Sequence, residues 1–193
     1  KEYIALVNGK TNNDGTIDAP LLKNEKDKYV RVDKHGLTAI TKYKRLTFND
    51  KYSLLKVNIL TGRTHQIRVH MAYIDHHLVN DDKYGNFNAN KEFNSIYKYK
   101  YQFLHSYMIT FSNIKGPLSY LSNKTFKAPL KTKQIQILSD LFKDLGDRIF
   151  DVIISNPPYI KSSDILGLQK EVKDFVERNN LDINNFILWK IFH

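Results

Sequence analysis

The segment "LTGRTHQIRVHMA", residues 60–72, places two arginines and two histidines within eight positions. These side chains could bind a metal, transfer protons or hold an anion. His65 and His70 are five residues apart, whereas two imidazoles share a helix face at a spacing of four. The spacing therefore disfavours zinc, and no metal site is predicted. Arg68 follows His65 by three residues, which places those two side chains on one helix face.

A strand, a tight turn and a helix are expected to position these residues. The stretch "YSLLKVNIL" alternates apolar and polar residues as a strand does, and Thr61-Gly62 ends it. From Thr64, a plausible N-cap, apolar residues recur at helical spacing: Ile67, Met71 and Ile74.

The start of this expected helix is a candidate anion site. A helix N-terminus offers unpaired N–H groups and a partial positive charge. Arg63 lies just before it, and His65 and Gln66 fall in its first turn. Positive side chains there oppose the helix dipole, so a carboxylate or phosphate partner would explain their presence.

The rest of the chain divides into two parts. Further strands are expected at "EYIALV", "AITKYKRL" and "YQFLHSYMITFSN", and a loop at "NDDKYGNFNANKEFN". After Lys133 the pattern changes to a short apolar strand, "FDVIIS", followed by an amphipathic helix over "SSDILGLQKEVKDFV". We therefore predict one domain over 1–133 and a second segment over 134–193.

The positive charge lies wholly in the first part. The chain has a formal net charge of +10, and residues 1–133 carry 23 basic and 11 acidic side chains. Such a basic domain favours a polyanionic partner, most commonly a nucleic acid. The chain has no cysteine and no apolar run of membrane-spanning length, so we expect a cytoplasmic protein without membrane contact.

Several motifs in the first part resemble one enzyme family. The segments "KEYIALVNG", "DGTIDAPL", "TGRTHQIRVHMA", "DHHLVNDDKYG", "FLHSYMITF" and "FKAPL" resemble, in order and spacing, the ribosomal large-subunit (RluA-type) pseudouridine synthases over about residues 1–132. The resemblance implies an α+β fold with a mixed, largely antiparallel sheet and flanking helices. It also implies an isomerase that converts uridine to pseudouridine in RNA, without cofactor or metal.

The resemblance assigns roles to five residues. Arg68 matches the catalytic arginine that pairs with the family's nucleophilic aspartate, and Tyr3 matches the catalytic tyrosine that stacks on the base or exchanges a proton with it. Arg63, His65 and Gln66 match the turn beside the pocket, where RNA binds. The implied partner is RNA, ribosomal by analogy, and no DNA partner is expected.

Two departures from the family pattern affect this interpretation. Asp75, His77 and Asn80 replace the family's glycines and proline after the helix, so the resemblance does not predict the conformation of this loop. The nucleophilic aspartate belongs to an H-R-L-D-type segment before the first strand, and this chain begins at Lys1. Asp81 matches another family position, as do Asp14 and Asp18, and is not a candidate. We therefore expect the isolated chain to be inactive, with Arg68 awaiting a carboxylate from outside the chain.

A second motif points to a different enzyme. The segment "DVIISNPPYI" and its flanks, residues 135–180, resemble the release-factor glutamine methyltransferases. The substrate-binding residues of that motif would be Asn156, Pro157, Pro158 and Tyr159. The resemblance implies a partial α/β, Rossmann-like methyltransferase segment. S-adenosylmethionine is expected as cofactor only if that segment were complete, and the glycine-rich loop that would hold it is missing.

Three functions stay open from the sequence alone. The first is a pseudouridine synthase fragment, the second is a protein-(glutamine-N5) methyltransferase fragment that acts on a release factor, and the third is a non-catalytic RNA-binding module. The sequence does not distinguish a gene fragment, a frameshift product and a chimera. It also leaves open which RNA and which uridine are recognised, whether 134–193 folds, and the oligomeric state.

Overall fold

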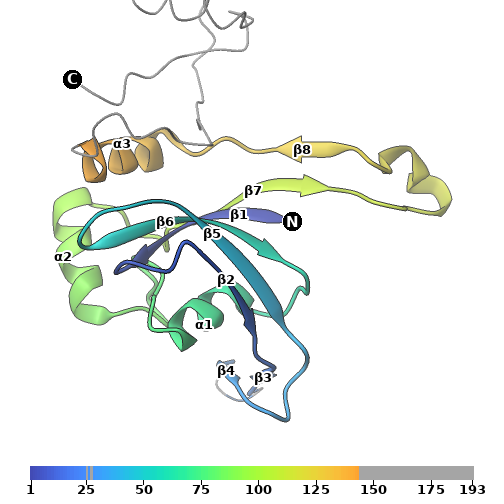
Figure 1. Ribbon diagram of the computed structural model, residues 1–193, viewed down its shortest axis with the longest axis horizontal. Coiled ribbons are helices and arrows are strands. Elements are labelled where there is room, and N and C mark those ends of the chain that lie inside the picture. The colour runs from blue at the N-terminus through green and yellow to red at the C-terminus, as the bar shows by residue number, and fades with distance from the viewer. Residues whose placement is uncertain (25, 27, 144–193) are drawn as a thin grey trace, which may run out of the picture. The chain divides into compact units, whose positions relative to one another are not determined.

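The computed structural model describes residues 1–24, 26 and 28–143, and residues 1–128 form one compact unit. Its centre is a six-stranded sheet in the order β2-β5-β6-β1-β7-β8 (Figure 1). The strands are β1 (Glu2–Asn8), β2 (Asp14–Asp18), β5 (Ile40–Phe48), β6 (Tyr52–Ile59), β7 (Leu104–Thr110) and β8 (Thr125–Lys127). Every described pairing in this sheet is antiparallel. The short strands β3 (Leu21–Lys23) and β4 (Val30–Val32) form a separate hairpin.

Strand β1 lies in the middle of the sheet because both its faces are apolar. Ile4, Ala5, Leu6 and Val7 are all fully buried. Successive side chains of a strand point to opposite faces. Ala5 and Val7 pack in a cluster with Met71 of helix α1 (Gln66–Tyr73), which covers that face of the sheet (Figure 1). The central strand thus anchors the helix that carries Arg68.

The expected strands and the apolar stripe of the first helix are confirmed. Strands β1, β5, β6 and β7 fall on the four stretches predicted from alternation. Ile67 and Met71 are buried in the same cluster, and Ile74 packs against it. The helical spacing therefore identified the buried face of α1 correctly.

Two local expectations are wrong. Thr64 is not the N-cap of α1; His65 is, in the left-handed region with φ 53° and without a side-chain cap. The segment predicted as a loop contains helix α2 (Phe87–Tyr97). Its many asparagines suggested a loop, but Asn86 caps the helix by accepting a hydrogen bond from the N–H of Ala89. Burial of Phe93 then fixes α2 against the unit.

The loop after α1 contains two residues in the left-handed backbone conformation that glycine adopts most easily. Asp75 and Asn80, two of the residues that depart from the family pattern, both have φ 60°. The N–H of Asp75 donates to Ala72 O, and the N–H of His76 donates to Met71 O. This is the Schellman arrangement that ends a helix on a left-handed residue. Because Asp and Asn tolerate this region better than other non-glycine residues, the replacements preserve the loop.

Asp75→Gly is expected to raise the free energy of unfolding by about 1 kcal/mol, or the melting temperature by about 3 °C. Glycine removes the left-handed strain, and it removes a negative charge from a helix C-terminus. The Asp75 side chain is 99% exposed, so little packing is lost. Thermal melts of this variant and of Asp75→Ala check the account. Alanine should lower stability, and an equal effect of both substitutions would contradict the strain argument.

The described residues after Ala128 belong to a second compact unit. They contain helix α3 (Thr132–Leu141), which crosses the predicted boundary between residues 133 and 134. The methyltransferase segment and its four motif residues lie outside the described residues, as do the strand and helix predicted there. In the described part of the chain, no helix is long and apolar enough to span a membrane.

Candidate functional site

Gln66 fixes the turn that leads into α1. Its side chain is buried, and its Oε1 accepts hydrogen bonds from the Arg63 N–H (2.9 Å) and the Thr61 hydroxyl (2.8 Å). Its Nε2 donates to Ile40 O and to Thr41 Oγ1, both at 3.0 Å. The amide therefore uses both ends within the protein. Gln66 ties the turn to the start of β5 and thereby positions its neighbours in the turn.

Arg63 lies at the surface of this turn. Its Nε donates to Thr38 O at 3.0 Å, and its side chain is exposed. Its two Nη groups have no partner among the residues that the structure describes. They can therefore meet an anion from solution, as the sequence predicted for this position.

Arg68 forms a buried ion pair with Asp81. Its Nε lies 2.7 Å from Asp81 Oδ2, and its Nη2 lies 2.6 Å from Asp81 Oδ1. The Asp81 side chain is 0% exposed and that of Arg68 is 13% exposed. Such a two-point contact is the strongest geometry available to an arginine and a carboxylate. The exposed Asp82 adds a third contact, 3.1 Å from the same Nη2.

The electrostatics of Asp81 follow from these contacts. Burial alone would raise the pKa of its carboxyl group. The Arg68 hydrogen bond and the N–H groups of Tyr84 (3.0 Å) and Lys83 (2.9 Å) outweigh burial and lower that pKa below its usual value of 3.8. The hydrogen bond to Asp81 likewise raises the pKa of Arg68. Both groups are therefore charged at neutral pH.

The carboxylate that Arg68 contacts in this structure comes from the chain itself, and pairing with a second carboxylate from outside the chain stays a prediction. Asp81, which sequence reasoning set aside, already holds Arg68. The partner was missed because thirteen residues and a loop with two left-handed turns separate the two. The sequence did contain a usable signal. An Asp side chain commonly accepts hydrogen bonds from the N–H groups two and three residues later, which forms a turn, and a buried arginine requires a carboxylate partner.

Tyr84 connects Arg68 to His65. The Arg68 guanidinium carbon lies 5.1 Å from the centroid of the Tyr84 ring, and the His65 ring meets the same ring edge-on at 5.5 Å. Both side chains therefore contact Tyr84, although His65 is the left-handed N-cap of α1 and does not lie in its first turn as predicted. Gly85, the next residue, has no room for a side chain, because a Cβ there would lie 2.1 Å from Asp81 O. Tyr84 was not predicted as part of the site.

A hydrogen bond joins His65 to Tyr84. The Tyr84 hydroxyl oxygen accepts from the Val30 N–H at 3.0 Å and lies 3.0 Å from His65 Nδ1. Burial and the nearby Arg68 charge lower the pKa of His65. The neutral imidazole is therefore favoured at pH 7.

Tyr3 lies apart from these contacts. It sits on β1 between Val57 of β6 and Ser106 of β7, and it packs half-buried against the apolar cluster that contains Ile67. It therefore shares the face of the sheet that α1 covers. The contacts described for Arg68 go to Asp81, Asp82 and Tyr84, so the structure does not bring the two predicted catalytic residues into contact.

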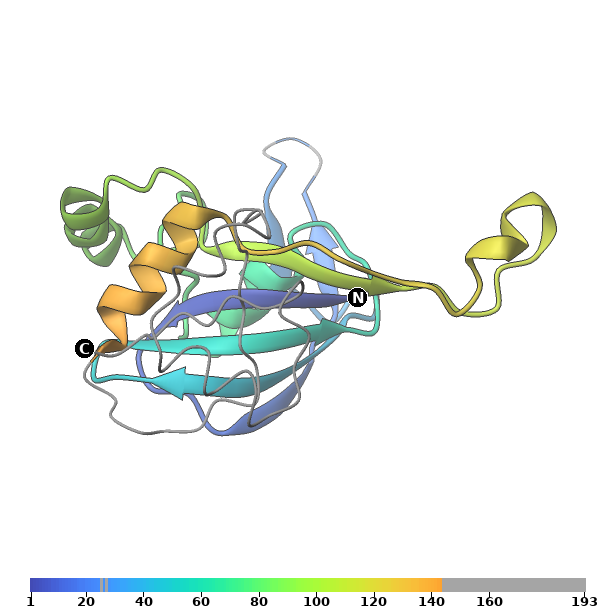
Figure 2. The ribbon, with the colours of Figure 1, turned by 90° about the horizontal axis from the view of Figure 1, so that it is seen from above.

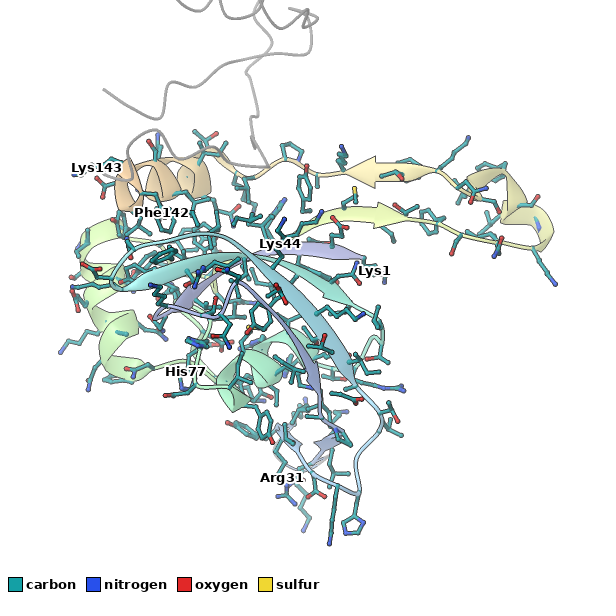
Figure 3. All side chains as sticks on the ribbon, in the orientation of Figure 1. Lys1, Arg31, Lys44, His77, Phe142 and Lys143 are labelled. Atoms are coloured by element: carbon teal, nitrogen blue, oxygen red, sulfur yellow. The ribbon has the colours of Figure 1, made fainter. Side chains whose placement is uncertain are left out.

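His70 has a structural position. It is fully buried, and its two ring nitrogens lie 2.9 Å from Thr41 Oγ1 and from Ala19 O. His77, labelled in Figure 3, has its Nδ1 2.6 Å from Tyr84 O. Among the described residues, no group of three or more His, Cys, Asp or Glu side chains could hold a metal.

The free energy of unfolding should fall as the pH drops below 6.5, the usual pKa of His70. Burial lowers the folded-state pKa of His70, so the unfolded chain binds the proton first and is favoured. One such group gives a slope of up to about 1.4 kcal/mol per pH unit. Denaturant unfolding between pH 7 and 5 measures it, with His65→Gln as background because His65 shifts the same way. If His70→Gln in that background leaves the slope unchanged, the assignment is wrong.

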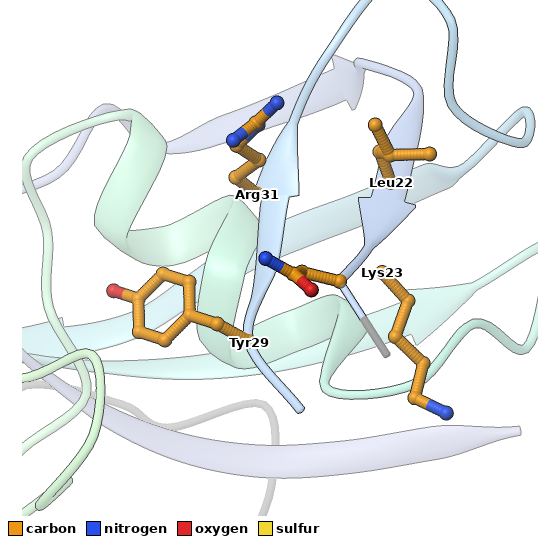
Figure 4. A pocket seen from close by; sticks show the side chains of 5 residues that line it. Leu22, Lys23, Tyr29 and Arg31 are labelled. Carbon is orange, nitrogen blue, oxygen red and sulfur yellow. The ribbon is translucent and has the colours of Figure 1, made fainter. Parts of the chain in front are cut away.

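A cavity of about 200 Å³ lies on the β3–β4 hairpin (Figure 4). It is lined by Leu22, Lys23, Asn24, Tyr29 and Arg31. Arg31 Nη2 is 3.1 Å from Asp33. The lining includes neither Tyr3 nor Arg68, so this cavity is separate from the two predicted catalytic residues.

The chain is similar to known pseudouridine synthases. Residues 1–73 match the family described as "RNA pseudouridylate synthase". The chain is 36% identical over 153 residues to ribosomal large subunit pseudouridine synthase D of Blochmanniella floridana, a match that covers 74% of this chain and 46% of the relative. It is 33% identical over 152 residues to the protein of the same name from Haemophilus influenzae, covering 75% and 45%. The chain thus spans a little under half the length of these relatives.

The fold is also that of known structures. The solved structure of human RNA pseudouridylate synthase domain containing 4 superposes with a TM-score of 0.56 at 20% identity, over 72% of this chain and 61% of that chain. The described part of this chain therefore has the pseudouridine synthase fold, with a largely antiparallel sheet and flanking helices. That outcome agrees with the α+β fold expected from the sequence.

Proposed function

We propose that this chain is part of an RNA pseudouridine synthase that isomerises uridine in ribosomal RNA. The observation that carries the proposal is the match of residues 1–73 to the family, because that span contains every isomerase-site residue predicted from the sequence. The relatives named above are ribosomal large-subunit enzymes, which supports ribosomal RNA as the substrate. We also propose the cytoplasm as its location.

In this proposal, the chain's residues bind and orient the substrate. The reaction breaks the bond from ribose C1′ to base N1 and forms a bond from C1′ to C5; C5 loses its hydrogen as a proton and N1 gains one, so the change is an isomerisation that consumes no cofactor. Arg63 and the neutral His65 contact the RNA beside the turn that Gln66 fixes. Tyr3 lies against the base, and Arg68 binds the carboxylate that starts the reaction.

The surroundings of Arg68 suggest where that second carboxylate binds. Asp81 occupies one edge of the guanidinium through two hydrogen bonds and is fully buried. Asp82 reaches Nη2 at 3.1 Å with a side chain that is 91% exposed. An exposed ion pair is weak and easily replaced. We propose that an incoming nucleophilic aspartate replaces Asp82 at Nη2 while Asp81 holds Arg68 in place.

The experiment joins this chain to the part of the Blochmanniella floridana relative that precedes the region of similarity. Tritium release from RNA labelled at uridine C5 is then measured for the fusion and for the isolated chain. Because we propose that the nucleophilic aspartate lies outside residues 1–193, the fusion should release tritium and the isolated chain should not. Release by the isolated chain would contradict that placement of the nucleophile. A folded fusion that binds RNA without release would contradict the proposed function.

A further inference from the structure

The hairpin of β7 and β8 extends beyond the strand that it pairs with. Pairing of β7 with β1 ends at Met108 opposite Glu2, near the start of β1. Pairing of β7 with β8 begins at Met108 opposite Lys127 and continues away from the sheet. Figures 1 and 2 show this hairpin projecting past the N-terminal end of β1, with the 3-10 helix η1 (Gly116–Leu121) at its tip. We call residues 111–127 the arm.

The arm is held together by its own contacts. Ser122 Oγ accepts from the Ile114 N–H at 2.9 Å and lies 3.1 Å from Ile114 O. The rings of Phe111 and Phe126 meet edge-on at 6.0 Å. Backbone hydrogen bonds between Phe111 and its neighbours across the hairpin, Asn123 and Lys124, close its base. These contacts hold the backbone of the hairpin on both sides of η1.

Its exposed side chains are basic and aromatic. No residue of η1 is buried, and Leu118, Tyr120 and Phe126 are 52%, 61% and 49% exposed. The arm contains three lysines, Lys115, Lys124 and Lys127, and no Asp or Glu. Lys124 Nζ lies 5.7 Å from the centroid of the Tyr120 ring, so a cation and an exposed ring form one surface.

We propose that the arm is a second RNA contact that binds unpaired nucleotides away from the turn at α1. Exposed rings stack on bases, and lysines neutralise phosphates, which is how single strands are bound without sequence preference. A purely apolar partner would leave the three lysine charges without counterions. This inference rests on the proposed function for the nature of the substrate, but it concerns a surface far along the chain from Arg68.

The test is fluorescence anisotropy of the full chain with a labelled single-stranded RNA over a range of salt concentrations. Replacing Lys115, Lys124 and Lys127 by Gln should reduce the slope of log K against log[salt] by about 2, since each phosphate contact on a single strand contributes about 0.7. The matched control replaces three exposed lysines near α2, Lys91, Lys98 and Lys100, by Gln and removes the same charge. The control should leave the slope nearly unchanged, and equal slopes for both triple variants would overturn the proposal.

A second set of variants separates the contribution of base stacking from that of charge. Tyr120→Leu should weaken single-strand binding about 5- to 100-fold, the range expected for one lost base stack, whereas Tyr120→Phe should bind as the unchanged chain does. A duplex of the same sequence should bind more weakly and should not respond to Tyr120→Leu. Loss with both substitutions, or no loss with either, would overturn the stacking role. If the unchanged chain binds no RNA, the proposed function is contradicted. If it binds RNA and every arm variant binds equally well, only the proposal about the arm is overturned.

Discussion

Arg68→Ala is expected to lower the free energy of unfolding by about 3–5 kcal/mol, the usual cost of leaving a buried charge without its partner. Asp81 is fully buried, and Arg68 supplies two of the four described hydrogen bonds to its carboxylate. For a chain of this length the loss corresponds to a melting temperature lower by about 10 °C. Denaturant unfolding of the variant measures it.

Asp81→Asn and Asp82→Asn form a matched pair for the same prediction. Asn at position 81 keeps an oxygen for the two backbone N–H groups but removes the charge that Arg68 needs, so a loss of about 3 kcal/mol is expected. Asn at the exposed position 82 should change stability by less than about 0.5 kcal/mol. Equal effects at the two positions would contradict the assignment of Asp81 as the structural partner.

The free energy of unfolding should also depend on pH in the acid range, because the Arg68–Asp81 interaction requires an ionised Asp81. The folded-state pKa of Asp81 is lower than its usual 3.8, so the unfolded chain takes up the proton first as the pH falls. The stabilisation is therefore fully present above about pH 4 and is lost as the pH falls through the lower folded-state pKa. Asp81→Asn should flatten this part of the stability curve, and an unchanged acid limb would show that Asp81 does not titrate in this way.

Gln66→Leu is expected to lower the free energy of unfolding by about 3 kcal/mol. The substitution removes the four hydrogen bonds of a buried amide, to the Arg63 N–H, Thr61 Oγ1, Ile40 O and Thr41 Oγ1, at a net cost of about 0.5–1.5 kcal/mol each. It also frees the turn that carries Arg63 and His65, so RNA affinity should fall as well. Chemical denaturation and RNA anisotropy on the same samples measure both effects.

Thr64→Ala is the control for the Gln66 prediction. Sequence reasoning made Thr64 the N-cap, and loss of a capping side chain costs about 1 kcal/mol. In the structure Thr64 is exposed and His65 is the N-cap, so Thr64→Ala should change stability by less than about 0.5 kcal/mol. A loss near 1 kcal/mol for Thr64→Ala, or none for Gln66→Leu, would contradict the positioning role of Gln66.

The parts of the fold that follow from local patterns could be predicted. Strands β1 and β6 carry alternating or continuous apolar residues, and the stripe on α1 has helical spacing, so burial of Val57 and Met71 follows from their positions in the sequence. Helix α2 could not be found this way. Its sequence is rich in asparagine, and the burial of Phe93 that stabilises it is a tertiary contact.

The candidate site was predictable in composition but not in geometry. The spacing of His65 and Arg68 predicted a shared helix face, whereas His65 is the N-cap of α1 and both side chains contact Tyr84. The Arg68–Asp81 pair depends on left-handed turns at Asp75 and Asn80, which no local pattern of non-glycine residues announces. The hydrogen bonds that the Gln66 amide donates likewise depend on the neighbouring strand β5.

The most direct test of the proposed function is tritium release by the fusion enzyme with Arg68 and with Arg68→Lys. Lysine keeps the charge beside Asp81, so the fold should persist, but it lacks the planar fork that can hold Asp81 and a second carboxylate together. We predict release from the fusion with Arg68 and a loss of at least about 100-fold with Arg68→Lys, at similar RNA affinity. Equal release from both, or none from either while both are folded and bind RNA, would contradict the account.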